Sequence, residues 1–421
     1  MKNIFRKIFS KQKAPSVKSE DNFGIPLTSL SGGSSMSPAQ AMRLETVYTC
    51  IRDKSETTGR IPIKLYRKKS DGTRERVKQG REFKIWTQEP NEYMGTINFL
   101  EFMVQSVETT GAFYAYLNEN TRGSVMEVIP FRYQRNVVPQ MDINGRVYYT
   151  YTTNDNKPGM SFGNEELLIV KLTTSDGYTP ISPIAYNSGM LEGAGAAEST
   201  YNNLHKNGIT SEVYLSTDAT LSDPAAERLK KQWDSYRGPK GISSTPILED
   251  GLKIHPLRIA PKDMELLKSR EYSVNRICQI FRVPIHRVGG ESNSSKDTQL
   301  ELDEAYMRNG IEPILRKYEE AVNRAFRNRK SVLEIEFNRR AFYAGSPKTM
   351  VEVSEKELKG GLCTVNEARE DNQRDPVEGG DVFAVDNNNV TYSTWDKLPE
   401  IQEMIYNNQQ TVSEDSDEEE E

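Results

Sequence analysis

Over residues 40–175 the apolar positions follow the rhythm of short strands. The segment 61–66 alternates apolar and polar residues with period two, and 166–172 is a compact apolar run like that of a buried strand. Asp71-Gly72 and Asn144-Gly145 are residue pairs that favour the tight turns of β-hairpins. This region is therefore predicted to be α+β, with antiparallel pairs formed by 61–66 with 74–77, 112–117 with 125–130, and 137–143 with 146–153.

Two helices are expected in the same region, and helical spacing predominates beyond residue 180. Thr96 is placed to cap one helix, and Ser182 to cap another. A long helical pattern contains Pro313, which should kink or break it because proline lacks the amide hydrogen and collides with the preceding turn. Thr364 should cap a short helix near Glu367. Together with the short helix near Glu367, the predicted helices are 39–58, 97–109, 184–205, 222–236, 262–281, 298–328 and 350–359. The further predicted strands are 212–216, 246–248 paired with 252–257, and 333–337.

The helix predicted over 184–205 is rich in small residues, among them Gly189, Gly193 and Gly195. Glycine costs about 1 kcal/mol inside a helix, so this many small residues require a reason. Close approach of another helix is the commonest one. A phosphate-binding loop is the alternative, but these glycines follow no obvious strand and lack the full spacing of such a loop. We therefore interpret them as a close-packing surface.

Charge is unevenly distributed along the chain. The formal net charge is -6. General nucleic-acid binders neutralise phosphates with clustered lysine and arginine, so this chain is not expected to be one. The first twenty residues are basic and the last eight are almost all acidic, and 14–36 has the composition of a flexible linker. The start of the chain is interpreted as a frayed or docked arm, with a membrane-surface helix or a DNA-touching arm as alternatives. No run of about 18 apolar residues occurs, so no membrane-spanning helix is expected.

The residues that carry enzyme chemistry are scattered. No phosphate-binding motif, nucleophile elbow or histidine pair at metal spacing is present. Cys278 and His286 are conceivable as a catalytic pair, but Cys278 lies in the apolar pattern of a helix and is better explained as a buried structural thiol. The acidic group at 297–304 begins a helix, where the helix dipole accounts for it. We expect no catalytic residue, no cofactor and no bound metal.

From about Val47 to Glu378 the chain carries an ordered series of short motifs. The motifs are Gly59-Arg60-Ile61-Pro62, Glu89-Pro90-Asn91, Thr110-Gly111-Ala112-Phe113-Tyr114, Asp176-Gly177-Tyr178-Thr179-Pro180-Ile181-Ser182-Pro183, Trp233 with Tyr236-Arg237-Gly238, Phe281-Arg282-Val283-Pro284 and Gly360-Gly361-Leu362-Cys363-Thr364-Val365-Asn366-Glu367-Ala368-Arg369. Their order and spacing resemble those of the portal, or head–tail connector, proteins of long-tailed bacteriophages. The chain departs from the family pattern at Phe113 where the family has Asn, at Thr179 where it has Gly, and at Arg282 where it often has Gly.

The resemblance implies an α+β portal fold with wing, stem helices, clip and small crown, assembled as a closed ring that is usually dodecameric. It also implies an order of parts along the chain. These are a flexible basic N-terminal arm (1–38), a wing (39–182), a stem helix (183–207), a clip (208–261), a second stem helix (262–282), a tunnel loop (283–297), a long kinked helix (298–330), a wing or crown return (331–386), and a C-terminal segment with a disordered acidic tail (387–421).

The implied function is structural: a channel at the capsid vertex through which double-stranded DNA is packaged and ejected. The implied partners are the terminase large subunit, the major capsid protein and scaffold, and a head–tail adaptor, in a virion assembled in the host cytoplasm. The polar tunnel loop would face DNA, although an ordinary surface connection is the plainer reading of the same residues. Its candidate DNA-facing residues are Arg287, Gly289, Gly290, Ser292, Asn293, Ser294, Ser295 and Lys296.

Three other readings remain open at the level of sequence. A connector from a gene transfer agent or prophage would have the same fold in a different setting. A nucleic-acid enzyme, either a metal-dependent nuclease or an ATPase, would require a site that the motifs do not reveal. A scaffold or adaptor protein without a channel would differ in its oligomeric symmetry.

Overall fold

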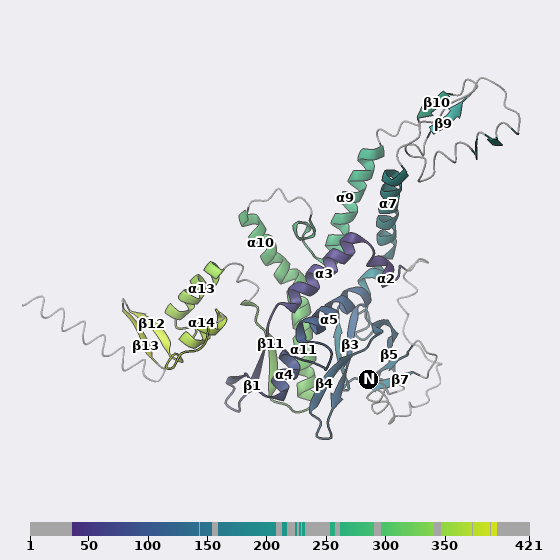
Figure 1. Cartoon of the computed structure of the whole chain (residues 1–421). Helices are drawn as coiled ribbons and strands as arrows, with labels where there is room; N and C mark the ends of the chain where they lie inside the picture. The colour runs from purple at the N-terminus through teal and green to yellow at the C-terminus, as the bar shows by residue number, and fades with distance from the viewer. Residues whose placement is uncertain are drawn as a thin grey trace, which may run out of the picture. The chain divides into compact units, whose positions relative to one another are not determined.

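The computed structural model describes most of the chain, which divides into two compact units, Met1–Phe337 and Asn338–Glu421 (Figure 1). The N-terminal arm, most of the helix predicted over 222–236, the strand predicted over 246–248 and the acidic tail lie outside the described residues. Those described are 36–142, 144–153, 159–207, 213–216, five residues between 224 and 231, 253–256, 262–289, 296–340, 347–372, 374–387 and 389–393.

The centre of the first unit is a pair of helices packed on an antiparallel sheet. Helices α3 and α5 contact each other, and α5 also contacts β3, the middle strand of the order β4-β3-β8. Fully buried side chains such as Ile51, Phe99 and Phe113 fill the space between them. The predicted pairing of 112–117 with 125–130 is confirmed, and so is the strand predicted over 166–172. The elements are α3 (Glu45–Gly59), α5 (Thr96–Thr110), β3 (Ala112–Glu119), β4 (Val125–Pro130) and β8 (Leu167–Lys171).

A second antiparallel sheet, in the order β5-β6-β7, packs on the first through aromatic side chains. Phe131 lies with its ring centroid 4.5 Å from that of Tyr151 and 5.3 Å from that of Phe162. The predicted hairpin around Gly145 is confirmed, and that glycine adopts the left-handed conformation such turns require. The third strand was not predicted, because it has only four residues and one buried side chain. The strands are β5 (Val137–Met141), β6 (Val147–Tyr151) and β7 (Met160–Gly163).

The third sheet joins distant parts of the chain, with β11 pairing with β1 and β1 with β2. The predicted β1–β2 hairpin is confirmed. The amphipathic helix α11 buries Ile314, Tyr318 and Val322 and contacts both β11 and β8. Helix α4 was missed from the sequence, although its Trp86 ring packs edge-on against Phe326 of α11. These elements are β1 (Ile63–Lys68), β2 (Arg74–Val77), α4 (Arg81–Thr87), α11 (Glu312–Asn328) and β11 (Leu333–Phe337).

Two long helices, α7 and α9, lie side by side and lead to a two-stranded sheet, β9-β10 (Figure 1). Ser182 caps the first turn as predicted, but the single helix predicted over 184–205 is wrong, because the backbone leaves the helical conformation at Asn187. Strand 253–256 pairs with 213–216, whereas its predicted pairing with 246–248 falls outside the described residues. The elements are α6 (Pro183–Tyr186), α7 (Ser188–Asn207), β9 (Val213–Ser216), β10 (Lys253–Pro256) and α9 (Lys262–Phe281).

Two other helix boundaries differ from the sequence predictions. The helix predicted over 39–58 is two helices, α2 (Pro38–Ala41) and α3, and Ser37 and Gln40 form a capping box at the start of the first. Thr96 was predicted to cap α5, but Gly95 occupies that position and Thr96 is the first helical residue.

The predicted break near Pro313 is confirmed. Helix α10 (Lys296–Tyr306) passes through a π-helical turn, η5 (Met307–Ile311), into α11. Pro313 has no amide hydrogen to donate to the carbonyl of Asn309, four residues earlier. The guanidinium of Arg282 donates to that carbonyl instead, at 3.4 Å. The turn is tight, since a Cβ atom at Gly310 would lie 2.7 Å from the Tyr306 ring.

In the second unit, the described residues form two helices and one hairpin. Thr364 and Glu367 form the predicted capping box at the start of α14, and Arg340 forms ion pairs with Glu357 and Asp371. The hairpin β12–β13 crosses residue 387, where the C-terminal segment was predicted to begin, and the acidic tail of that segment falls outside the described residues. The elements are α13 (Pro347–Lys359), α14 (Val365–Asp371), β12 (Phe383–Asn387) and β13 (Asn389–Ser393). Within the described part of the chain, no helix is long and apolar enough to cross a membrane.

Candidate functional site: a polar network around Arg287

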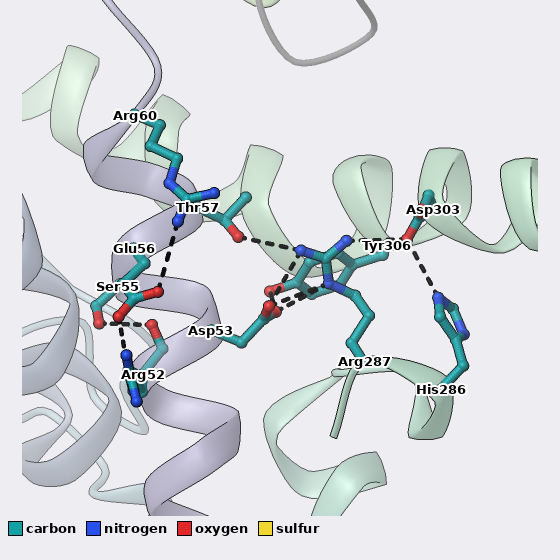
Figure 2. A network of polar contacts seen from close by, with 10 residues as sticks. All are labelled: Arg52, Asp53, Ser55, Glu56, Thr57, Arg60, His286, Arg287, Asp303 and Tyr306. Carbon is teal, nitrogen blue, oxygen red and sulfur yellow. Dashed lines mark hydrogen bonds and ion pairs between the residues drawn. The ribbon is translucent and has the colours of Figure 1, made fainter. Parts of the chain in front are cut away.

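Arg287 lies at the centre of a network that joins three segments of the first unit (Figure 2). It belongs to η4 (Ile285–Val288), a 3-10 turn that follows α9 after Val283-Pro284. Its Nε and Nη2 donate to the carboxylate of Asp53 on α3, at 3.0–3.2 Å. Its Nη1 donates to Oδ1 of Asp303 on α10, also at 3.0 Å. One guanidinium therefore bridges two carboxylates from helices far apart in the sequence.

The remaining contacts fix the orientation of these groups. The Tyr306 hydroxyl donates to Oδ2 of Asp53 at 2.7 Å, and the guanidinium lies 4.9 Å from the centroid of the Tyr306 ring. The imidazole Nε2 of His286 lies 3.2 Å from Oδ1 of Asp303. Asp303 and Tyr306 are three residues apart, which places them on one face of α10. The helix therefore presents an acceptor and a ring to the same arginine.

The network is half-buried, with exposed side-chain fractions of 24% for Arg287, 18% for Asp53 and 39% for Asp303. Burial alone would lower the pKa of Arg287, but the hydrogen bonds and charge of Asp53, with the hydrogen bond to Asp303, outweigh it and raise the pKa above its ordinary value. Burial and the charge of Asp53 raise the pKa of Tyr306 well above its ordinary range. Arg287 therefore stays charged and Tyr306 stays a donor across the working pH range.

This arrangement can hold segments together, and it offers little for catalysis. Its arginine is committed to two carboxylates, and no cluster of His, Cys, Asp or Glu among the described residues is arranged to hold a metal. Cys278 is buried, as predicted, and its hydrogen-bond partner is Cys50, whereas His286 lies beside Asp303. The contact with Cys278, together with burial, raises the pKa of Cys50 far above its ordinary value, whereas the same contact lowers the pKa of Cys278.

Of the residues predicted to face DNA, the structure describes Arg287, Gly289 and Lys296. Arg287 was expected to face DNA, but its guanidinium is engaged by Asp53 and Asp303. Gly289 ends the 3-10 turn in the left-handed conformation, and Lys296 begins α10. Gly290, Ser292, Asn293, Ser294 and Ser295 lie outside the described residues.

The small residues of α7 differ among themselves. A Cβ atom at Gly195 would contact Leu44 at 3.3 Å, whereas one at Gly189 or Gly193 would meet no described atom within 4 Å. Packing within the described chain thus accounts for the small residue at Gly195 and leaves the other two facing open space.

Sequence reasoning missed Asp53 and Tyr306 and explained Asp303 by the helix dipole alone. The sequence did carry a signal for Asp53. It lies three residues after Cys50 and four before Thr57, which are both buried on the same helix. An acidic residue adjoining the buried face of a helix requires a partner. The sequence did not indicate which arginine would supply it.

The solved structures that this fold resembles include a gene transfer agent neck and a phage portal protein. The chain aligns with a subunit in the neck of an empty gene transfer agent particle with a TM-score of 0.58 and 17% identity, covering 82% of this chain and 95% of that one. It aligns with the crystal structure of an HK97-family phage portal protein from Corynebacterium diphtheriae with a TM-score of 0.54 and 14% identity, covering 74% and 99%. The fold is thus that of a neck or portal subunit.

Sequence comparison gives the family. Residues 45–372 match the family model described as phage portal protein. The portal protein of Enterobacteria phage HK97 is 24% identical over 83% of both chains, and the probable portal protein of Streptomyces phage phiC31 is 23% identical over 83% of this chain and 78% of its own. The chain belongs to the phage portal protein family.

Proposed function

We propose that this protein is one subunit of a ring, with twelve subunits as in the usual portal, which forms the channel for double-stranded DNA at the capsid vertex. The match of residues 45–372 to the portal family is the observation that carries this proposal. The role is structural and not enzymatic. The terminase large subunit would dock on the ring during packaging and a head–tail adaptor afterwards, with the major capsid protein and scaffold around it, after assembly in the host cytoplasm.

The parts of the portal can be assigned to elements of this chain. We assign the two sheets and helices over 39–182 to the wing, α7 and α9 to the stem, and the region of the β9–β10 sheet to the clip. Gly189 and Gly193 support the stem assignment, because the absence of side chains there allows a neighbouring subunit's helix to approach closely. Residues 331–386 return to the wing or crown.

The charge balance suits a conduit that must not hold its cargo. Duplex DNA carries about one negative charge per 1.7 Å, and each lysine or arginine contact adds salt-sensitive affinity. A ring repeats every such contact in each subunit. This chain has a net charge of -6, and its Arg287 is neutralised by two aspartates of the same subunit.

The purified full-length protein is expected to form symmetric rings with a central opening wide enough for duplex DNA. Negative-stain electron microscopy with native mass measurement checks this and gives the subunit number. A strictly monomeric protein, even when mixed with its capsid protein, would contradict the proposal, and ATPase and nuclease assays would then test the enzyme alternative.

Bulky replacements in the proposed tunnel loop should obstruct the channel. Replacing Ser292–Ser295 by tryptophan is expected to leave ring assembly unchanged and to lower the yield of DNA-filled heads, because large rings replace small polar side chains in every subunit. The measurement is packaged-genome yield, with the same substitutions in the acidic tail at 414–417 as the control. Normal yield from the loop variant would show that the loop does not line the path of the DNA.

A further inference from the structure

The described side chains of α10, at 301–306, contribute one buried residue to the packing of the first unit. Among its described side chains over 301–306, only Tyr306 is buried, and Glu301, Leu302 and Glu304 are exposed. The helix is continued by the π-helical turn η5, so its C-terminal end is tethered to a turn of non-standard geometry. Its direction relative to α3 therefore depends on polar contacts.

Arg287 supplies those contacts from a position outside both helices. It binds Asp53 of α3 on one side and Asp303 of α10 on the other, and it stacks on Tyr306. Charge-assisted hydrogen bonds are directional, unlike apolar contacts. The guanidinium presents several donors in a fixed, planar arrangement and so holds two carboxylates at once, whereas a lysine offers a single ammonium group.

We propose that Arg287 is a positioning residue that fixes the direction of α10 relative to α3 and thereby sets how the subunit meets DNA in the channel. The inference rests on the proposed function, and it replaces the direct DNA contact expected for Arg287 from the sequence. Within the proposed tunnel loop, Arg287 lies before residues 290–295, and Asp303 lies after the loop on α10. The bond between Arg287 and Asp303 therefore joins the described chain on the two sides of those residues.

The test compares hydrogen exchange of the assembled full-length protein with packaging by the same variants. Arg287→Met keeps the bulk of the side chain and removes its hydrogen bonds, so amide exchange over 296–306 should become about tenfold faster or more. Asp303→Asn removes only the charge on α10 and leaves the bonds between Arg287 and Asp53, and the same peptides should respond. Both variants should form rings and lose DNA-filled heads relative to the unaltered chain.

Arg52→Met is the matched control, because Arg52 lies next to Asp53 on α3 and forms an exposed ion pair with Glu56. Its exchange over 296–306 and its yield of filled heads should equal those of the unaltered chain. Equal acceleration across the whole first unit in Arg287→Met and Asp303→Asn would reduce Arg287 to a general stabilising residue and overturn the proposal.

Unchanged exchange over 296–306, or filled heads at the level of Arg52→Met, would overturn it as well. Failure of the unaltered chain to yield filled heads would count against the proposed function. The exchange measurement would still decide whether Arg287 positions α10.

Discussion

Replacing Lys54 by methionine is expected to lower the free energy of unfolding by about 3–5 kcal/mol, among the largest effects of any single substitution in this chain. Lys54 on α3 forms an ion pair with Glu108 on α5, and their side chains are only 4% and 2% exposed. Methionine fills the same space but leaves the Glu108 carboxylate buried without its counter-ion. The measurement is urea unfolding followed by circular dichroism.

The double substitution Lys54→Met with Glu108→Leu separates the ion pair from the space it fills. It is expected to recover most of the lost stability, because apolar residues of similar volume often replace a buried ion pair at no net cost. Arg52→Met, in an exposed pair on the same helix, should leave the free energy of unfolding close to that of the unaltered chain. A double variant no more stable than Lys54→Met would show that the shape of these side chains, and not their charge, stabilises the α3–α5 contact.

Replacing Gly111 by alanine is expected to cost more than about 3 kcal/mol and to reduce the yield of soluble protein sharply. Gly111 ends α5 in the left-handed conformation, with φ of 88°. A Cβ atom there would lie 2.6 Å from the carbonyl carbon of Ile181 and 2.9 Å from the amide nitrogen of Ser182. Both are backbone atoms, so a rotamer change does not relieve the clash, and the contact between α5 and the start of α6 must open.

Gly123→Ala isolates the conformational part of that cost. Gly123 has φ of 76°, but a Cβ atom there would meet no described atom within 4 Å. Its substitution should therefore cost only about 1 kcal/mol, the usual penalty for a left-handed non-glycine residue. Thermal unfolding of the two variants beside the unaltered chain makes the comparison. Equal shifts for both would mean that the Ile181 backbone yields readily.

The sequence correctly predicted several hairpins and helix caps, because the residues that form them are neighbours in the chain. The hairpin turns at Asp71-Gly72 and Asn144-Gly145 carry their own signal, and so do the caps at Ser182 and Thr364. The pairing of β1 with β11 has no local signal, because Ile63 and Phe337 are neighbours only through the fold of the whole unit. Helix α4 was missed because it is short and its Trp86 is buried by distant residues.

The site was harder to predict than the fold for the same physical reason. Arg287 was identified as part of a polar loop, but its charge is balanced by Asp53, which lies 234 residues earlier in the sequence. Arg282 is comparable. It stands where the family often has glycine, adopts φ of 55°, and donates to the carbonyl that Pro313 leaves unbonded. The sequence showed that departure, but only the structure shows what it compensates.

The pairing of β1 with β11 has a consequence for the protein as it emerges from the ribosome. The strand at Ile63–Lys68 is complete long before its partner at Leu333–Phe337 has been made. At about 5–20 residues per second, this interval is roughly 13 to 54 s. Throughout it, one edge of the nascent β1–β2 hairpin has unpaired backbone groups, and such edges template association between chains. Copies made on neighbouring ribosomes would share this hazard, so the rate of translation through residue 337 bears directly on how much of the chain folds without associating.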